Sequence, residues 1–200
     1  MPLILTSVSG LEGHIAQTAK SERPFVVAID GRSGVGKSTL AEVLAASLGG
    51  AVIEGDDFYA GGTEFRGDAP EARASACIDH TRQRLVLTVL RAGGEASWRA
   101  FDWEAFDGRL CDEPTRLEPK TIVILEGVYA ARPELADLVD LRVLVELAEE
   151  ARLERLLRRE GAIGAWERQW HQAEDFYFEH VMPASVFDIV LRSQAGALEP

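Results

Sequence analysis

The segment Ala28 to Thr39, "AIDGRSGVGKST", constrains the fold more than any other part of the 200-residue chain. It overlaps the apolar run "PFVVAI" and leads into "LAEVLAASLG", where Leu and Val recur at helical spacing from Leu40 to Leu48. A continuous apolar run is typical of a strand that is buried on both faces of a parallel sheet. The sequence therefore predicts a strand, a glycine-rich turn and a helix in direct succession.

The turn "GRSGVGKS" matches G-x-x-x-x-G-K-[ST], the pattern of a phosphate-binding loop. Its glycines let the backbone curl so that several N–H groups point into one concavity, and the helix that follows adds the positive end of its dipole. Lys37 can reach the β- and γ-phosphates, and Ser38 can ligate magnesium. We expect ATP and Mg²⁺ as cofactors. The expected nucleotide-binding residues are Gly31, Ser33, Gly34, Val35, Gly36, Lys37, Ser38 and Thr39.

Composition narrows the function classes. The net charge of −12 and the lack of a basic stripe argue against a nucleic-acid partner. No apolar run approaches the roughly 18 to 20 residues of a membrane span, and no basic segment precedes the N-terminal apolar patch, so we expect neither a membrane partner nor a secretion signal. Two cysteines, Cys77 and Cys111, suit a reducing compartment, and the expected location is cytoplasmic.

Strand-like and helix-like segments alternate along the chain. This pattern predicts an α/β fold, with a mainly parallel sheet and helices on both faces, organised as one domain over residues 1–200. Besides the strand and helix around the glycine loop, strands are expected at 51–58, 97–103, 121–127, 141–147 and 187–192, and helices at 11–20, 81–92, 133–139, 149–160 and 165–180. A loop with room for a short helical part is expected at 60–75.

Acidic residues follow several predicted strands: Asp30, the pair Asp56 and Asp57, and Glu126. The carboxyl ends of parallel strands share one edge of a sheet, so these side chains should meet there. A guanine-selecting N-K-x-D is absent, and one small domain leaves little room for a motor. A small-molecule kinase instead needs a carboxylate base, an acidic magnesium ligand and basic groups on a closing lid.

Five segments, in order along the chain, resemble the uridine kinase-like group of P-loop kinases, which includes pantothenate kinase and phosphoribulokinase. They are "EGDDFYAGG", "IDHTRQR", "AFDWEAFD", "TIVILEGVYA" and "ARLERLLRRE", and the resemblance spans roughly residues 24 to 192. It implies a three-layer P-loop NTPase fold with a helical lid at about 158–170. It is also compatible with a homo-oligomer.

The resemblance implies a role for each matching residue. Asp56 would activate the acceptor hydroxyl, and Glu126 would lie near magnesium and the acceptor, with Ser38 as the other metal ligand. Together with Lys37, arginines of the lid helix would act on the transferring phosphoryl group, with Arg155 and Arg159 preferred over Arg158. The residues expected at the acceptor are Tyr59, Asp79, Phe101, Trp103 and Glu126.

Two departures from the family pattern leave the acceptor open. The lid contains Trp166 and Trp170, which we expect to be core, and only Arg168 in place of further arginines. In the family, a pyrimidine-nucleoside pocket also uses a histidine shortly after the segment that "AFDW" resembles, and no histidine follows closely here. We expect a nucleoside acceptor, with pantothenate or a sugar as alternatives, and a nucleotide-binding regulator or an ATPase as the alternatives without transfer. Asp79 precedes a helix, so it could equally cap that helix.

Overall fold

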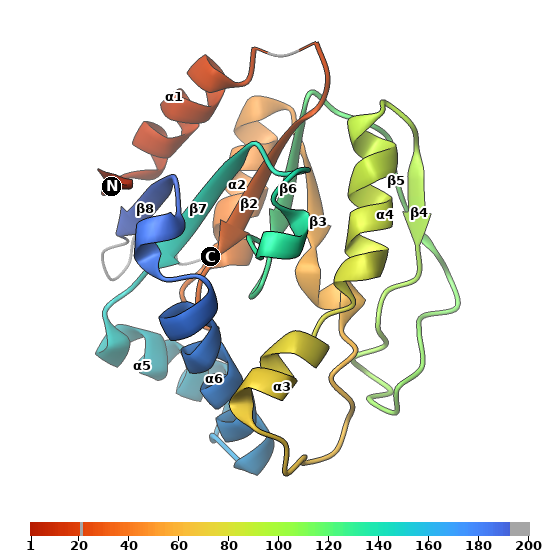
Figure 1. Ribbon diagram of the computed structural model, residues 1–200, viewed down its shortest axis with the longest axis vertical. Coiled ribbons are helices and arrows are strands. Elements are labelled where there is room, and N and C mark those ends of the chain that lie inside the picture. Colours follow the sequence, from red (N-terminus) through yellow and green to blue (C-terminus); the bar gives the residue numbers. More distant parts are fainter. Residues whose placement is uncertain (21, 193–200) are drawn as a thin grey trace.

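The computed structural model describes residues 1–20 and 22–192 and shows a six-stranded, wholly parallel sheet (Figure 1). The strand order is β1-β8-β7-β2-β6-β3, and β4 and β5 form a separate antiparallel pair. The strands are β1 (Leu3–Leu5), β2 (Phe25–Asp30), β3 (Ala51–Glu54), β4 (Ala96–Trp98), β5 (Thr115–Leu117), β6 (Ile122–Glu126), β7 (Leu141–Glu146) and β8 (Ile189–Arg192).

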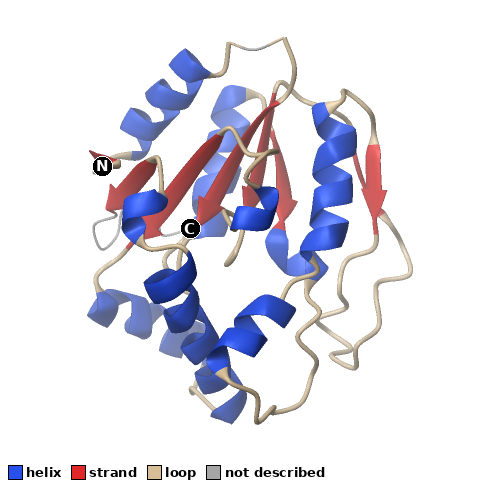
Figure 2. Cartoon of the chain, viewed as in Figure 1, coloured by secondary structure: helices blue, strands red, loops and turns tan. Residues whose placement is uncertain are grey.

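Helices cover both faces of the sheet (Figure 2). The α-helices are α1 (Val8–Thr18), α2 (Lys37–Leu48), α3 (Pro70–Ala76), α4 (His80–Arg91), α5 (Glu149–Glu160) and α6 (Ala165–Phe176). Short 3-10 turns occur at η1 (Gly55–Phe58), η2 (Pro133–Leu135) and η4 (Ala184–Val186), and a π-helical turn, η3 (Tyr177–Val181), extends α6. Within the described ranges, no helix combines the length and apolar character needed to cross a membrane.

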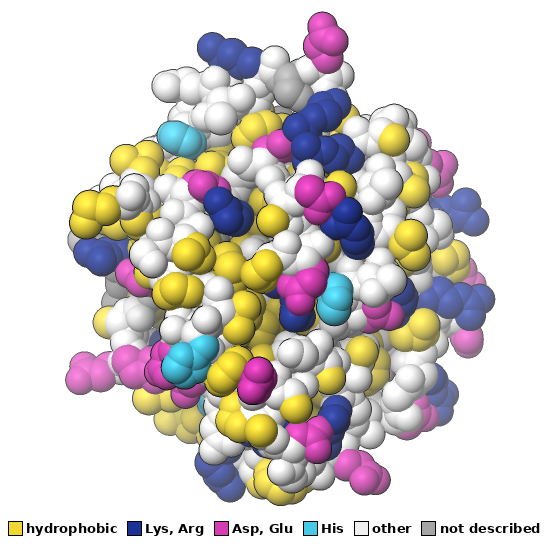
Figure 3. Space-filling model, in the orientation of Figure 1, with side chains coloured by type: hydrophobic (Ala, Val, Ile, Leu, Met, Phe, Trp, Pro, Cys, Tyr) yellow, Lys and Arg dark blue, Asp and Glu magenta, His cyan; other side chains and the backbone are white. Residues whose placement is uncertain are grey.

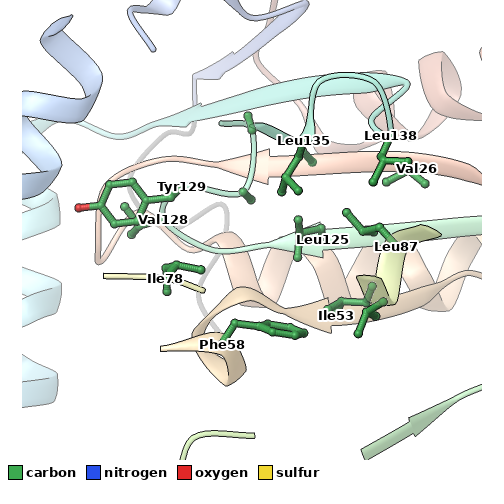
Figure 4. Packing of buried hydrophobic residues seen from close by; sticks show 14 of the residues in the cluster. Val26, Ile53, Phe58, Ile78, Leu87, Leu125, Val128, Tyr129, Leu135 and Leu138 are labelled. Carbon is green, nitrogen blue, oxygen red and sulfur yellow. The ribbon is translucent and has the colours of Figure 1, made fainter. Parts of the chain in front are cut away.

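Two buried apolar clusters hold these layers together. In one, α1 and α2 pack on β2, β6 and β7, with Leu11, Ile15 and Leu40 fully buried. In the other, α4, η1 and η2 pack on the opposite face, where Phe58, Leu87 and Leu135 contact the sheet (Figure 4). Each interior strand therefore contributes to both clusters, which explains the continuous apolar runs of β2 and β6.

The predicted α/β architecture is confirmed, with some local differences. The strand expected at 51–58 ends at Glu54, and its two aspartates lie in η1. The segment 60–75 is a loop followed by most of helix α3, in agreement with the partly helical loop that was predicted. The strand expected at 97–103 is reduced to β4 and an isolated bridge at Phe101. The strands β1 and β5 were not predicted. Each has three residues, too few for a periodic pattern.

The register of the sheet brings the acidic strand ends together, as predicted. Glu126 at the end of β6 pairs with Glu54 of β3 on one side and with Ile29 of β2 on the other. The glycine-rich loop leaves β2 at this edge. In Figure 1, α5 and α6 lie beyond the same edge, and Arg152 of α5 and Glu174 of α6 both hydrogen-bond Ser33 of the loop.

Candidate active site

The glycine-rich loop begins directly after β2 and ends where α2 starts. Gly34 has φ +85°, and a Cβ there would lie 2.9 Å from Leu156 Cγ on α5, so only glycine fits without displacement. Lys37 is buried, with its ammonium 3.2 Å from the carbonyl of Arg32. Six loop residues line a cavity of about 440 Å³, here called the loop cavity: Ser33, Gly34, Gly36, Lys37, Ser38 and Thr39. The other two predicted residues, Gly31 and Val35, are buried and do not line this cavity.

Asp30 fixes the start of this loop. Its fully buried carboxylate accepts hydrogen bonds from the amides of Gly31, Tyr129 and Ala131 at 2.8 to 3.0 Å, and from the hydroxyl of Tyr177 at 2.8 Å. Burial raises the pKa of Asp30 to about 6, and the hydrogen bonds from Ala131, Tyr177 and Gly31, together with the charge of Lys37, limit that rise. Asp30 therefore joins three parts of the chain by hydrogen bonds. They are the glycine-rich loop, the segment after β6 and the end of α6.

Glu126 and Ser38 are in contact, as the magnesium prediction requires. Ser38 donates a hydrogen bond to Glu126, whose pKa burial raises to about 7 despite the nearby Lys37. Glu126 is only 6 % exposed and lines the loop cavity with Ser38. A hydroxyl and a buried carboxylate suit a magnesium ion whose other ligands are phosphate oxygens and water. Among the described residues, no group of three Asp, Glu, His or Cys side chains forms a metal site by itself.

Asp56 lies in the turn η1, beside this pair. Its carboxylate is accessible from inside the loop cavity, yet the surrounding walls remove enough water to raise its pKa, which Lys37 and Arg159 partly counteract. The neighbouring Asp57 is engaged elsewhere, because it accepts a hydrogen bond from Trp98 Nε1 at 2.7 Å. Of the two aspartates, only Asp56 therefore presents its carboxylate to the loop cavity.

Three arginines of α5 line the loop cavity from the opposite side. Arg155 has a buried terminal nitrogen without a hydrogen-bond partner, and Arg159 lies 2.7 Å from Glu160. Arg158 pairs with Glu154 at the exposed surface. The predicted lid, 158–170, corresponds to the end of α5, a turn and the first half of α6.

A second cavity, of about 620 Å³, adjoins the first. Here called the aromatic cavity, it shares Ser33, Asp56, Leu156 and Arg159 with the loop cavity. Four aromatic side chains form much of its wall: Trp103, Phe106, Trp166 and Trp170. Asp56 thus faces both the nucleotide loop and a space large enough for a small ligand.

Ser33 links the two cavities. Its hydroxyl donates to the fully buried Glu174 and accepts from Trp170 Nε1 at 3.1 Å, and its amide donates to Glu174 at 3.2 Å. Arg152 of α5 donates to the Ser33 carbonyl at 3.1 Å. The glycine-rich loop is therefore fastened to both helices that close the site.

The predicted acceptor residues separate into three groups. Trp103 lines the aromatic cavity and Glu126 lines the loop cavity. Phe101 is 4 % exposed and packs behind Trp103 with ring centroids 4.8 Å apart. Tyr59 is also buried, and its hydroxyl donates to the carbonyl of Gly62. Asp79 caps α4 by accepting from the Arg82 amide at 3.0 Å and is not among the residues lining either cavity.

Sequence reasoning missed four residues of the site. Trp166 and Trp170 were expected in the core, and they do pack against it, but they also line the aromatic cavity. Their spacing of four residues predicts that they share one face of a helix. It does not predict whether that face contacts the core or lines a cavity. Glu174 lies one turn beyond Trp170, so the same spacing predicts that it shares their helix face. Asp30 was noted as a strand end, but three of its four hydrogen bonds come from segments about 100 and 147 positions away.

Known proteins share this combination of loop and fold. The family model of the phosphoribulokinase / uridine kinase family matches residues 26–164. This chain belongs to that family. The match contains the glycine-rich loop, Asp56, Glu126 and α5, and ends just before α6. It supports a phosphotransferase that acts on a small molecule.

Individual relatives are distant. A uridine kinase of Clostridium botulinum is 28% identical over 152 residues, covering 70% of each chain, and one of Ligilactobacillus salivarius is 25% identical over 150 residues, covering 70% of this chain and 68% of that protein. In fold, the chain is similar to a protein described as a possible uridine kinase from Bacillus stearothermophilus, with a TM-score of 0.71, 22% identity and coverage of 92% and 96%. A D-glycerate 3-kinase from Cryptococcus neoformans gives a TM-score of 0.66 at 15% identity, covering 94% of each chain.

Proposed function

We propose that this protein transfers the γ-phosphate of Mg-ATP to a hydroxyl of a small molecule bound in the aromatic cavity, with a nucleoside as the leading acceptor class. One observation carries the proposal: Asp56 is accessible from both cavities, between the glycine-rich loop and the aromatic wall. The aromatic side chains suit a planar base, and the uridine kinases among the relatives support a nucleoside.

In the proposed reaction, the Asp56 carboxylate takes the proton of the acceptor hydroxyl. The acceptor oxygen bonds to the γ-phosphorus as the bond from that phosphorus to the β–γ bridging oxygen breaks, and ADP leaves. Lys37, Arg155 and Arg159 would balance the charge on the transferring group. Ser38 and Glu126 would hold magnesium, which would supply positive charge that neutralises part of the charge of the phosphates.

The test measures ADP release with Mg-ATP against nucleosides, pantothenate, ribulose phosphate and simple sugars. Wild type is compared with Asp56→Asn and with Asp112→Asn, an exposed aspartate outside both cavities. We expect one acceptor class to stimulate release in wild type and Asp112→Asn, and at least a hundredfold less in Asp56→Asn.

Two results would contradict this assignment. Equal hydrolysis of ATP in all three proteins, independent of any acceptor, would favour an ATPase and remove Asp56 as the base. Tight ATP binding without release for any compound would favour a nucleotide-binding regulator.

A further inference from the structure

The aromatic cavity has a geometry that a neutral acceptor does not require. Trp103 and Phe106 stack with centroids 6.0 Å apart and an interplanar angle of 23°, and Trp166 and Trp170 stack at 6.0 Å and 13°. The two pairs meet edge to face, because Phe106 and Trp166 lie 5.5 Å apart at 81°. We call these four side chains the aromatic corner. They come from the segment after β4 and from α6.

Carboxylates surround this corner. Glu54, Asp56, Glu160 and Glu167 all line the aromatic cavity, whereas among the described residues Arg159 is its one Lys or Arg, and His171 is its one His. Arg159 is ion-paired with Glu160 at 2.7 Å, so these two charges partly offset each other, and Glu54, Asp56 and Glu167 remain as the other carboxylates of the cavity. Glu167 accepts the amide of Gly164 at the start of α6. No ion pair joins Glu54 to a basic side chain in the part of the chain that the structure describes.

Aromatic faces and carboxylates attract the same kind of ligand. The negative face of an indole or phenyl ring binds an organic cation, and several rings around one space are typical of sites for such cations. Nearby carboxylates add to this attraction, and they repel phosphates and carboxylates. A neutral pyrimidine gains stacking from the corner but nothing from the surplus of negative charge.

We propose that the acceptor is a small alcohol that carries a positively charged planar ring, such as a pyridinium, and that the ring lies in the aromatic corner while its hydroxyl points to Asp56. This inference rests on the proposed function for the reaction, but the cation site stands on the corner and its carboxylates. It disfavours ribulose phosphate and pantothenate as acceptors, because both are anions.

The experiment compares the binding of two isosteric alcohols that differ in charge. They are 3-(hydroxymethyl)-1-methylpyridinium and 3-methylbenzyl alcohol, with uridine as a neutral nucleoside. Calorimetry and quenching of tryptophan fluorescence measure affinity without ATP. The proteins are wild type, Glu54→Gln, Trp166→Leu and, as a charge-matched control, Glu118→Gln, an exposed residue outside both cavities.

We expect the pyridinium to bind about tenfold more tightly than its neutral isostere in wild type and in Glu118→Gln. Trp166→Leu should weaken the pyridinium several-fold, and Glu54→Gln should lower the ratio between the two alcohols. Equal affinities for the two alcohols in wild type, or tighter binding of uridine than of the pyridinium, would overturn the inference.

The failure of this inference can be distinguished from the failure of the proposed function by measuring ADP release with the same compounds. If uridine stimulates ADP release but the pyridinium does not bind more tightly than its neutral isostere, the proposed kinase activity is supported and the cation site is contradicted. Selective binding of the pyridinium without ADP release for any alcohol supports the cation site and contradicts the kinase.

Discussion

Single residues at this site are constrained by backbone geometry as much as by chemistry. Gly34 illustrates this, because its φ of +85° and the 2.9 Å approach of Leu156 both exclude a larger residue. We expect Gly34→Ala to move the loop and to weaken ATP binding at least tenfold, measured by calorimetry. Gly49→Ala is the matched control: φ is +64° there, but no atom lies within 4 Å of the added Cβ. It should cost about 1 kcal/mol of stability and leave ATP affinity unchanged.

If both glycine variants weakened ATP binding equally, strain at positive φ alone would explain the effect. The contact between the glycine-rich loop and α5 would then have no part in binding.

Asp30 should make stability depend on pH. Its pKa is about 6 in the folded protein against 3.8 ordinarily, so between these values the folded state binds more protons than the unfolded state. The contribution of Asp30 to stability is therefore highest below pH 4 and falls as pH rises to about 6, by on the order of 3 kcal/mol. We expect urea unfolding of wild type and Asp30→Asn to show this as a loss of wild-type stability relative to the variant over that range. A constant difference would contradict it.

At the level of elements, a buried group of each helix hydrogen-bonds the glycine-rich loop, Arg152 from α5 and Glu174 from α6, and α5 also carries exposed ion pairs. Glu174→Gln leaves a single oxygen for the amide and hydroxyl of Ser33, so we expect a loss of about 1 to 3 kcal/mol of unfolding free energy and weaker ATP binding. Glu154→Gln breaks the exposed pair with Arg158 and should cost about 0.5 kcal/mol or less. Similar losses in both variants would show that the contact with Ser33 contributes little.

The elements that sequence predicted well are those with long periodic patterns. The bounds of α5 were predicted as observed, and β2, β6 and β7 were within a few residues, because burial on both strand faces leaves a continuous apolar run. The segment before α3, rich in Gly, Ala and Asp, carries no such pattern. The three-residue strands β1 and β5 depend on neighbours far away in the chain, which no local window contains.

The same distinction applies to the site. The glycine-rich loop, Asp56 and Glu126 were predicted because each follows a recognisable strand. Of the aromatic corner, Trp103 was predicted at the acceptor, but Trp166 and Trp170 were not. They become a cavity wall only where α6 passes Trp103 and Phe106, about 60 positions earlier in the chain. For Asp79 the sequence left two roles open, contact with the acceptor and capping of the next helix, and the structure shows the helix cap.

At the scale of the whole molecule, the net charge is unfavourable for binding a nucleotide. The net charge is −12, and Figure 3 shows Lys and Arg scattered among Asp and Glu over one face. A nucleotide therefore depends on the local positive field of Lys37, the loop amides and the α5 arginines. Magnesium would reduce the charge that this small region has to balance.

The family match starts at residue 26, yet residues 1–20 complete the sheet and one of the two apolar clusters. Leu11 of α1 is fully buried there, whereas Leu3 of the edge strand β1 is 45% exposed. If this segment folds as part of one cooperative unit, Leu11→Ala should lower the free energy of unfolding by about 2 to 5 kcal/mol, with Leu3→Ala near 0.5 kcal/mol or less. Urea denaturation should give one transition with an unchanged slope for both. A second transition, or a negligible effect of Leu11→Ala, would mean that α1 is an appended layer and that the cooperative unit is the matched region alone.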